Sequence, residues 1–147
     1  MHGADNGVVN RQDAQDAKLP EPDLELDDVA RIVVDAAVEV HRVLGPGFLE
    51  SVYEQALGVE LWLRGVSFAR QVPIGLTYKG VQIGHARLDL LVAERLVVEL
   101  KASQDVLPIH LAQTLSYLKA TFHPLGLVIN FNVRVLGQGI RRVIRTR

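Results

Sequence analysis

Cysteine is missing from this chain of 147 residues. Disulfides, thiolate metal sites and cysteine nucleophiles are therefore excluded. The absence fits a reducing compartment, and we expect a cytoplasmic protein. Long apolar runs are missing too, since none approaches the roughly 18 residues of a membrane-spanning helix. The first residues carry no basic cluster followed by an apolar stretch, so we expect neither a signal peptide nor a membrane partner.

Negative charge is scarce outside the first 28 residues. Those residues hold eight acids against two bases, a net of −6, whereas the remainder holds 14 bases and 9 acids, a net of +5. The overall net charge of −1 therefore hides a mildly basic body, which is compatible with a polyanionic partner. The same charge is common in proteins that bind no nucleic acid, so it does not indicate a function by itself.

The apolar pattern indicates one domain after a polar tail. Residues 1–24 are acidic and aperiodic, and we expect a disordered N-terminal tail followed by a single domain at residues 25–147. We expect helices at residues 26–44, 49–63 and 108–122, and strands at residues 66–72, 74–78, 81–92, 96–102, 125–131 and 140–144. This order predicts an α/β or α+β fold with one mixed central sheet flanked by helices.

Charged residues interrupt two of the predicted strands. Asp89 lies among leucines, where a solvated carboxylate has no obvious reason to be. Glu99 and Lys101 follow three β-favouring apolar residues and are two positions apart, so both side chains project from one face of a strand. An acid and a lysine in this pattern are usually a solvated ion pair, and that interpretation stays open beside a catalytic one.

A three-residue hairpin loop at residues 93–95 would place Asp89 opposite Glu99, with Cβ atoms roughly 4.5–5.5 Å apart. Two carboxylates this close repel each other unless one is protonated or a cation lies between them. Lys101 supplies part of that compensation, and Mg²⁺, which favours carboxylates, water and phosphate oxygens, would supply the rest. Such a metal polarises a phosphoryl oxygen and activates water, while Lys101 can orient that water and stabilise developing charge. The pattern therefore predicts phosphodiester hydrolysis.

Asp89 followed by Glu99-Leu100-Lys101 resembles the motifs of the PD-(D/E)xK nuclease superfamily. That resemblance implies a restriction-endonuclease-like core: a helix, an antiparallel sheet that holds both motifs, a further helix and a final strand. Upstream, the segment Gly47-Phe48-Leu49-Glu50-Ser51-Val52-Tyr53 resembles the signature of the GxxExxY protein family within this superfamily. The similarity extends from about Leu26 to the C-terminus. Leu88 stands where the first motif usually has proline, at a position that varies widely.

The resemblance implies further site residues. Glu50 would be a catalytic acid and, with Asp89 and Glu99, a ligand of Mg²⁺ or Mn²⁺. The alternative for Glu50 is a residue that the helix dipole favours near an N-terminus, and Glu54 is the rival acid one turn later. Tyr53 is predicted to pack rather than to react.

In the third helix, Gln113 and Tyr117 reproduce a Gln-xxx-Tyr spacing found in RecB-like nucleases. Together with His110 they occupy one helix face. We expect Gln113 to act at the catalytic face and Tyr117 and His110 to contact substrate. The alternative is an ordinary polar helix surface, which we favour for His110.

The sequence thus predicts a metal-dependent nuclease whose partner is nucleic acid, more readily DNA than RNA. Two alternatives stay open: a catalytically silent nuclease-fold module that binds nucleic acid, and a protein-interaction module. A homodimer is plausible for so small a nuclease, because one site cuts one strand. Strandedness, sequence preference and endo- or exonuclease action are not encoded in these motifs.

Overall fold

The computed structural model describes residues 24–146, so the predicted tail lies outside the described residues except for Leu24. The elements follow in the order α2 (Leu24–Leu44), α3 (Glu50–Leu63), β1 (Phe68–Tyr78), β2 (Val81–Val92), β3 (Leu96–Lys101), α4 (Pro108–Thr121), β4 (Leu125–Asn130), the 3₁₀ helix η1 (Leu136–Gly139) and β5 (Ile140–Ile144). Within residues 24–146, no helix combines the length and the apolar character that crossing a bilayer requires.

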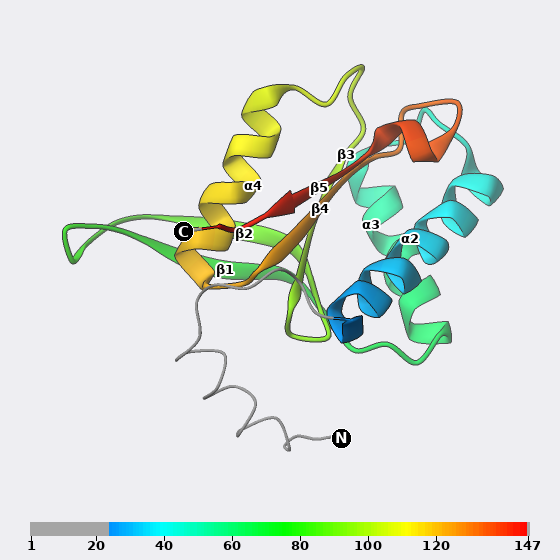
Figure 1. Cartoon of the computed structure of the whole chain (residues 1–147). Helices are drawn as coiled ribbons and strands as arrows, with labels where there is room; N and C mark the ends of the chain where they lie inside the picture. Colours follow the sequence, from blue (N-terminus) through cyan, green and yellow to red (C-terminus); the bar gives the residue numbers. More distant parts are fainter. Residues whose placement is uncertain (1–23, 147) are drawn as a thin grey trace.

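One mixed sheet forms the centre of the molecule, with its strands in the order β1-β2-β3-β4-β5. All neighbouring strands are antiparallel except β3 and β4, which run parallel and are joined through α4. Helices α2 and α3 cover one face and α4 covers the other (Figure 1). The two central strands are buried along almost their whole length, as their apolar sequences predict. The predicted α+β fold with a mixed sheet is therefore confirmed.

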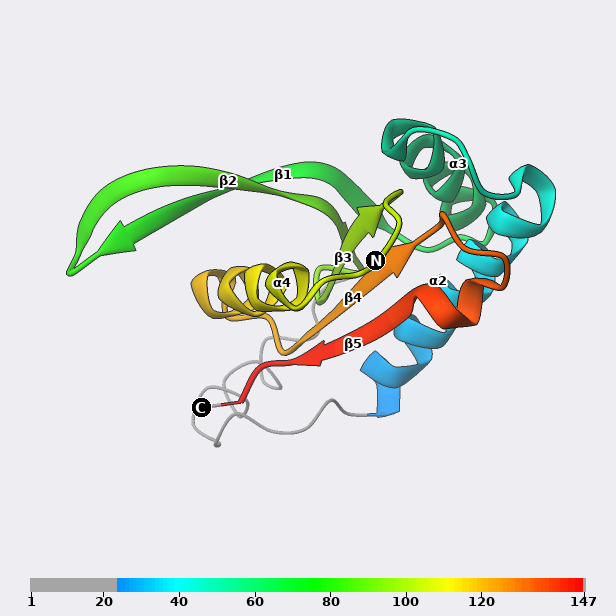
Figure 2. The ribbon, with the colours of Figure 1, turned by 90° about the horizontal axis from the view of Figure 1, so that it is seen from above.

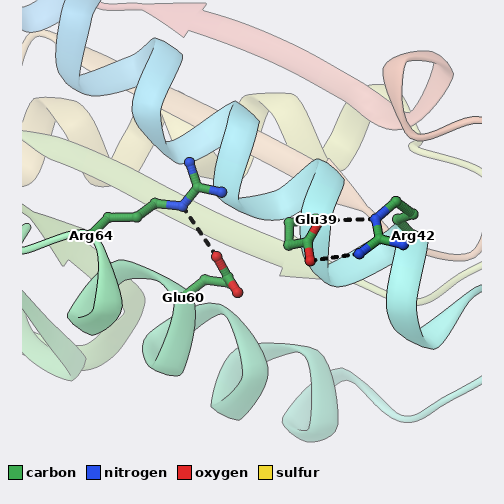
Figure 3. Close-up of polar contacts among 4 residues, drawn as sticks. All are labelled: Glu39, Arg42, Glu60 and Arg64. Atoms are coloured by element: carbon green, nitrogen blue, oxygen red, sulfur yellow. Dashed lines mark hydrogen bonds and ion pairs between the residues drawn. The ribbon is translucent and has the colours of Figure 1, made fainter.

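Apolar residues at helical spacing bind α2 to the sheet. Leu26, Ala30, Val33, Ala37 and Val40 are buried in the larger of two apolar clusters, and this face follows the 3.6-residue period. The opposite faces of α2 and α3 carry short-range ion pairs (Figure 3).

The ion pairs in Figure 3 join residues of the same helix. Arg42 binds Glu39 through two hydrogen bonds of 2.9 and 2.8 Å, and Arg64 lies 3.1 Å from Glu60. The hydrogen bond from Arg42 lowers the pKa of Glu39, and the positive charges of Arg42 and Arg64 lower it further. Exposed pairs of this kind contribute little to stability, so they account for surface charge rather than for function.

The predicted break between strands at residues 66–72 and 74–78 is wrong, because both belong to the single strand β1. Pro73 lacks an N–H group, but β1 is an edge strand, where proline does not interrupt a continuous ladder. The domain therefore has three strands before α4 rather than four. Sequence analysis also missed η1, which is too short for a periodic signal.

The hairpin formed by β1 and β2 rolls over part-way along its length. Leu90 packs in the cluster beneath α2 and α3, whereas Leu88, two positions away, packs in the cluster beneath α4. Residues two apart in a strand normally share a face, so the ribbon turns over between them. At this place Arg70 pairs with Leu90, and Val72 pairs with Leu88. Gln71 lies between them, opposite Asp89, and takes no part in the ladder; its φ is 53°.

Beyond this point the β1–β2 ribbon projects from the body of the protein (Figures 1 and 2). Its turn at Lys79-Gly80 agrees with the predicted turn, and both residues have positive φ.

We predict that Gly139→Ala destabilises the domain, whereas Gly137→Ala does not. A Cβ atom at Gly139 would overlap the carbonyl oxygen of Asn130, while one at Gly137 would meet no atom within 4 Å. Neither glycine has a positive φ, so space alone distinguishes these neighbours in η1. The expected loss for Gly139→Ala is about 1–3 kcal/mol, as for other overpacked sites. Urea denaturation of both variants measures it, and equal midpoints would contradict the prediction.

Candidate active site

The candidate site lies where β2 separates from β3. The predicted three-residue loop at residues 93–95 is present, and the ladder pairs Val92 with Leu96, Leu91 with Val97 and Leu90 with Val98. Beyond the pair of Leu90 and Val98 the two strands no longer pair: the part of β2 before Leu90 pairs only with β1, and the part of β3 after Val98 pairs only with β4.

Side chains replace the ladder at this separation. The N–H of Leu100 donates to Oδ2 of Asp89 at 2.8 Å, and the N–H of Asp89 donates to Oε2 of Glu99 at 3.1 Å. The two predicted acids are therefore brought together, each holding the backbone of the opposite strand. These bonds satisfy backbone groups that would otherwise lose their partners inside the protein.

Burial disfavours the charged form of both acids, and the charges of neighbouring carboxylates add to this effect. Glu99 is only 5% exposed, and burial, followed by the charge of Asp89, raises its pKa to about 8. Burial is also the main cause that raises the pKa of Asp89, and the charges of Glu54 and Glu50 add to it. A cation bound beside these acids would stabilise their charged forms.

One oxygen of each carboxylate has no hydrogen-bond partner in the described part of the chain. Among residues 24–146, Oδ1 of Asp89 and Oε1 of Glu99 accept no hydrogen bond. Two neighbouring carboxylates that each offer a hard oxygen donor fit Mg²⁺ or Mn²⁺, which take one or two protein carboxylates and complete their shell with water and phosphate. Over the described part of the chain, however, no three His, Asp or Glu side chains are grouped closely enough to hold a metal ion together.

Lys101 follows Glu99 by two residues at the end of β3 and is half-buried. Its positive charge lowers the pKa of both Asp89 and Glu99, which places it within electrostatic reach of the pair. Between residues 24 and 146 no carboxylate lies within ion-pairing distance of Lys101, so its ammonium group remains available to a substrate or water.

Glu50 is the first residue of α3 and is exposed. Its charge raises the pKa of both Asp89 and Glu99, so the helix directs it towards the pair, but it forms no three-carboxylate cluster with them. Its predicted role as a metal ligand therefore stays a prediction.

Tyr53 fixes the entry into α3. Its ring is fully buried and stacks on Phe131 with centroids 4.4 Å apart, while its hydroxyl donates to the carbonyl of Gly45 at 2.5 Å and accepts from the N–H of Phe48 at 3.2 Å. Gly47 has φ of 109°, which only glycine adopts readily. These contacts place Glu50, and they agree with the predicted packing role of Tyr53.

Glu54 is tied to β1 rather than free to bind a metal. It is 7% exposed, and its Oε2 accepts from Arg70 at 3.0 Å while its Oε1 accepts from Gln71 at 2.8 Å. Both oxygens are therefore occupied at the roll of the ribbon, directly across from Asp89. Glu54 positions the strand beside Asp89, a role that sequence analysis did not assign.

Helix α4 faces the pair through Tyr117. Burial raises the pKa of its hydroxyl, as do the charges of Glu99 and Asp89, so this half-buried side chain lies near both acids. Gln113, one turn earlier, is exposed and has no hydrogen-bond partner among the described residues. His110 instead uses Nδ1 to accept the N–H of Leu107 at 3.0 Å, which caps the first turn of α4.

Asn130 organises the loop after Lys101. It is 1% exposed, its Oδ1 accepts from the N–H groups of Ser103 and Asn132, and its Nδ2 donates to the carbonyl of Ser103. Sequence analysis missed this residue, although an amide at the end of an apolar strand was a signal, because a buried amide must find partners.

A family model described as the PD-(D/E)XK nuclease superfamily matches residues 27–143 of the chain. The match includes every residue of the site, from Glu50 to Tyr117. No curated protein and no solved structure matches the chain significantly.

We predict that Glu99→Gln stabilises the metal-free protein increasingly as the pH rises. The folded state holds the Glu99 proton up to a pKa of about 8, whereas the unfolded chain releases it near the usual 4.5. Between these values the folded state binds more protons, so wild-type stability falls with rising pH. A glutamine cannot ionise and avoids this loss.

Thermal melts in EDTA at pH 5, 7 and 8.5 measure the effect. The melting temperature of Glu99→Gln minus that of wild type should grow across this series. Glu94→Gln, which changes an exposed acid in the hairpin turn, serves as the matched control. A pH-independent difference for Glu99→Gln would contradict the assigned burial.

We predict that Gln71→Gly is tolerated better than Gln71→Val. Glycine adopts the φ of 53° freely and loses only the hydrogen bond to Glu54, whereas the branched valine is strained there by about 1–3 kcal/mol. Valine should therefore displace Asp89 and weaken Mn²⁺ binding, as measured by urea denaturation and calorimetry. If both variants bind Mn²⁺ equally and are equally stable, the roll of the ribbon does not position Asp89.

Proposed function

The chain belongs to the PD-(D/E)XK nuclease superfamily, and from this premise we propose that it is a metal-dependent nuclease that hydrolyses phosphodiester bonds in DNA. One observation carries the proposal beyond family membership. Asp89 and Glu99 are held together although the charge of Asp89 disfavours ionised Glu99, and each keeps an oxygen with no hydrogen-bond partner among residues 24–146. A divalent cation offsets that repulsion and uses those oxygens.

Asp89 and Glu99 would hold Mg²⁺ or Mn²⁺, and Glu50 would reach it through water from the start of α3. When bound, such an ion polarises a phosphoryl oxygen and lowers the pKa of a water molecule. Glu99, whose pKa burial raises to about 8, would have to lose its proton to serve as a ligand. Metal affinity should therefore increase with pH up to that value.

Lys101 and α4 would act on the substrate. The ammonium group of Lys101 lies at the end of β3 beside the pair and can orient the attacking water and stabilise charge on the phosphate. The Tyr117 hydroxyl, near both acids, can donate to a phosphate oxygen, and Gln113 is exposed on the same helix to contact the strand. His110 contributes by capping α4, which supports Tyr117.

A catalytically silent nucleic-acid-binding module is the second candidate. It is favoured by the lack of a three-acid metal cluster among residues 24–146. The two candidates differ in metal-dependent turnover, so one experiment separates them.

We predict that Asp89→Asn strongly weakens both metal binding and cleavage. The amide keeps the size of the side chain but removes the charge that attracts the ion, and the loss of several kcal/mol of transition-state stabilisation lowers the rate by about a hundredfold or more. Calorimetric titration with Mg²⁺ and Mn²⁺, with cleavage of single- and double-stranded DNA and of RNA, measures both effects.

Asp35→Asn, an identical change at an exposed position of α2, is the matched control and should behave as wild type. Binding of nucleic acid by wild type without any metal-dependent cleavage would favour the silent module. Equal metal affinity in wild type and Asp89→Asn would sink the assigned metal site.

A further inference from the structure

The outer part of the β1–β2 ribbon, residues 72–88, is here called the arm. One face of it packs under α4 through Ile74 and Leu88. Its other face and its tip extend beyond the helices (Figure 2). There Tyr78, Val81 and Ile83 are 62%, 63% and 64% exposed, which is unusual for large apolar side chains on one short ribbon.

The charges of the arm are all of one sign. It contains Lys79 and Arg87, and no aspartate or glutamate. Both cations are exposed, and no carboxylate of residues 24–146 pairs with either of them. Lys79 lies over the ring of Tyr78 at 5.4 Å, and the exposed His85 stands two residues before Arg87. A partner for this surface must therefore be anionic and must offer room for a ribbon.

We propose that the arm lies in the major groove of double-stranded DNA and holds the duplex at the candidate active site. The major groove admits a two-stranded β-ribbon, and its walls are lined by phosphates. Lys79 and Arg87 would contact those phosphates, and the exposed apolar side chains at the tip would contact base edges such as thymine methyl groups. This inference rests on the proposed nuclease function and names the duplex as its substrate form.

Continuity with the site supports this partner. Arg87 is two residues from Asp89 on the same strand, so the arm begins where the carboxylates lie. From Asp89 to Val81 the strand rises roughly 27 Å, at about 3.4 Å per residue. That length matches about 8 base pairs of duplex at about 3.4 Å each. Because the groove is inclined to the duplex axis, the tip would contact DNA within about 8 base pairs of the bond at the site.

A second copy of this chain fits the arm less well. In a symmetric dimer the same surface meets itself, so Lys79 and Arg87 of each arm would face like charges. No acidic residue of the arm compensates for that repulsion. Dimerisation through the arm is therefore an outcome of the test rather than the proposal.

The test measures binding of full-length protein in EDTA, where no metal supports cleavage. The arm variant Lys79→Gln/Arg87→Gln is compared with Arg31→Gln/Arg142→Gln, which removes the same charge from exposed positions on α2 and on β5 at the opposite edge of the sheet. Fluorescence anisotropy is followed at several salt concentrations with a 30-base-pair duplex, the corresponding single strand and an 8-base-pair duplex.

The arm variant should bind the 30-base-pair duplex about tenfold more weakly than wild type. Its slope of log K against log salt should fall by about 0.9 for each lost phosphate contact, hence by up to about 1.8. The control variant should keep the wild-type slope. The loss should shrink on the single strand and on the 8-base-pair duplex, which offer no long groove to the arm.

Equal losses in both double variants would overturn the proposal, because net charge alone would then explain them. An arm variant that changes oligomeric state instead of duplex affinity would overturn it in favour of a second copy. Cleavage assays with Mn²⁺ keep this question apart from the proposed function. If wild type cleaves DNA and the arm variant binds the duplex as tightly as wild type, only the proposed role of the arm is wrong. If the arm variant binds the duplex more weakly but wild type cleaves no nucleic acid, the proposed nuclease function is wrong.

Discussion

The structure depends on how β2 changes partners at Asp89. Before this residue β2 belongs to the outer ribbon, and after it β2 pairs on both sides within the central sheet. Where the two strands separate, the backbone N–H groups of Asp89 and Leu100 have no partner in the ladder. The Glu99 carboxylate accepts the first of them and the Asp89 carboxylate accepts the second. The same bonds hold the two acids together. A structural requirement of the sheet and a chemical requirement of the site are thus met by one pair of side chains.

Neighbouring contacts decide which acids remain free. Tyr53, stacked on Phe131, holds the loop before α3 so that Glu50 starts the helix towards the pair, while Glu54 is neutralised by Arg70 and bonded to Gln71. Two acids one helical turn apart therefore differ in role because of their partners. The site concentrates negative charge where burial already disfavours it, as the pKa of about 8 for Glu99 shows. Such an arrangement lowers the stability of the protein without metal, and under the proposed function a bound cation would restore it.

Much of this could be predicted from local pattern. Apolar periodicity predicts the helices, and the two-residue repeat of strands predicts the loop at residues 93–95 and the proximity of Asp89 to Glu99. Each of these patterns can be read within a single segment of the chain. The continuity of β1 through Pro73 could not be predicted, because it depends on β1 lying at the edge of the sheet. Neither could the roll at Gln71, since a change of face depends on which helix covers each half of the ribbon. The pairing of Glu54 with Arg70 joins residues 16 apart in different elements, and no periodicity encodes such a contact.

The roll at Gln71 links the arm to the chemistry. Because Asp89, Arg87 and Ile83 all lie on β2, their relative orientation is set by how far the ribbon turns between Leu90 and Leu88. Glu54 holds that turn through Gln71, and the turn directs the outer ribbon away from the sheet that carries Glu99 and Lys101. A polyanion lying along the arm would therefore meet the carboxylates at a position set by the part-buried hydrogen bond between Gln71 and Glu54. In the proposed function, this backbone distortion would decide which phosphate reaches the site, and the acids and the lysine would act on it.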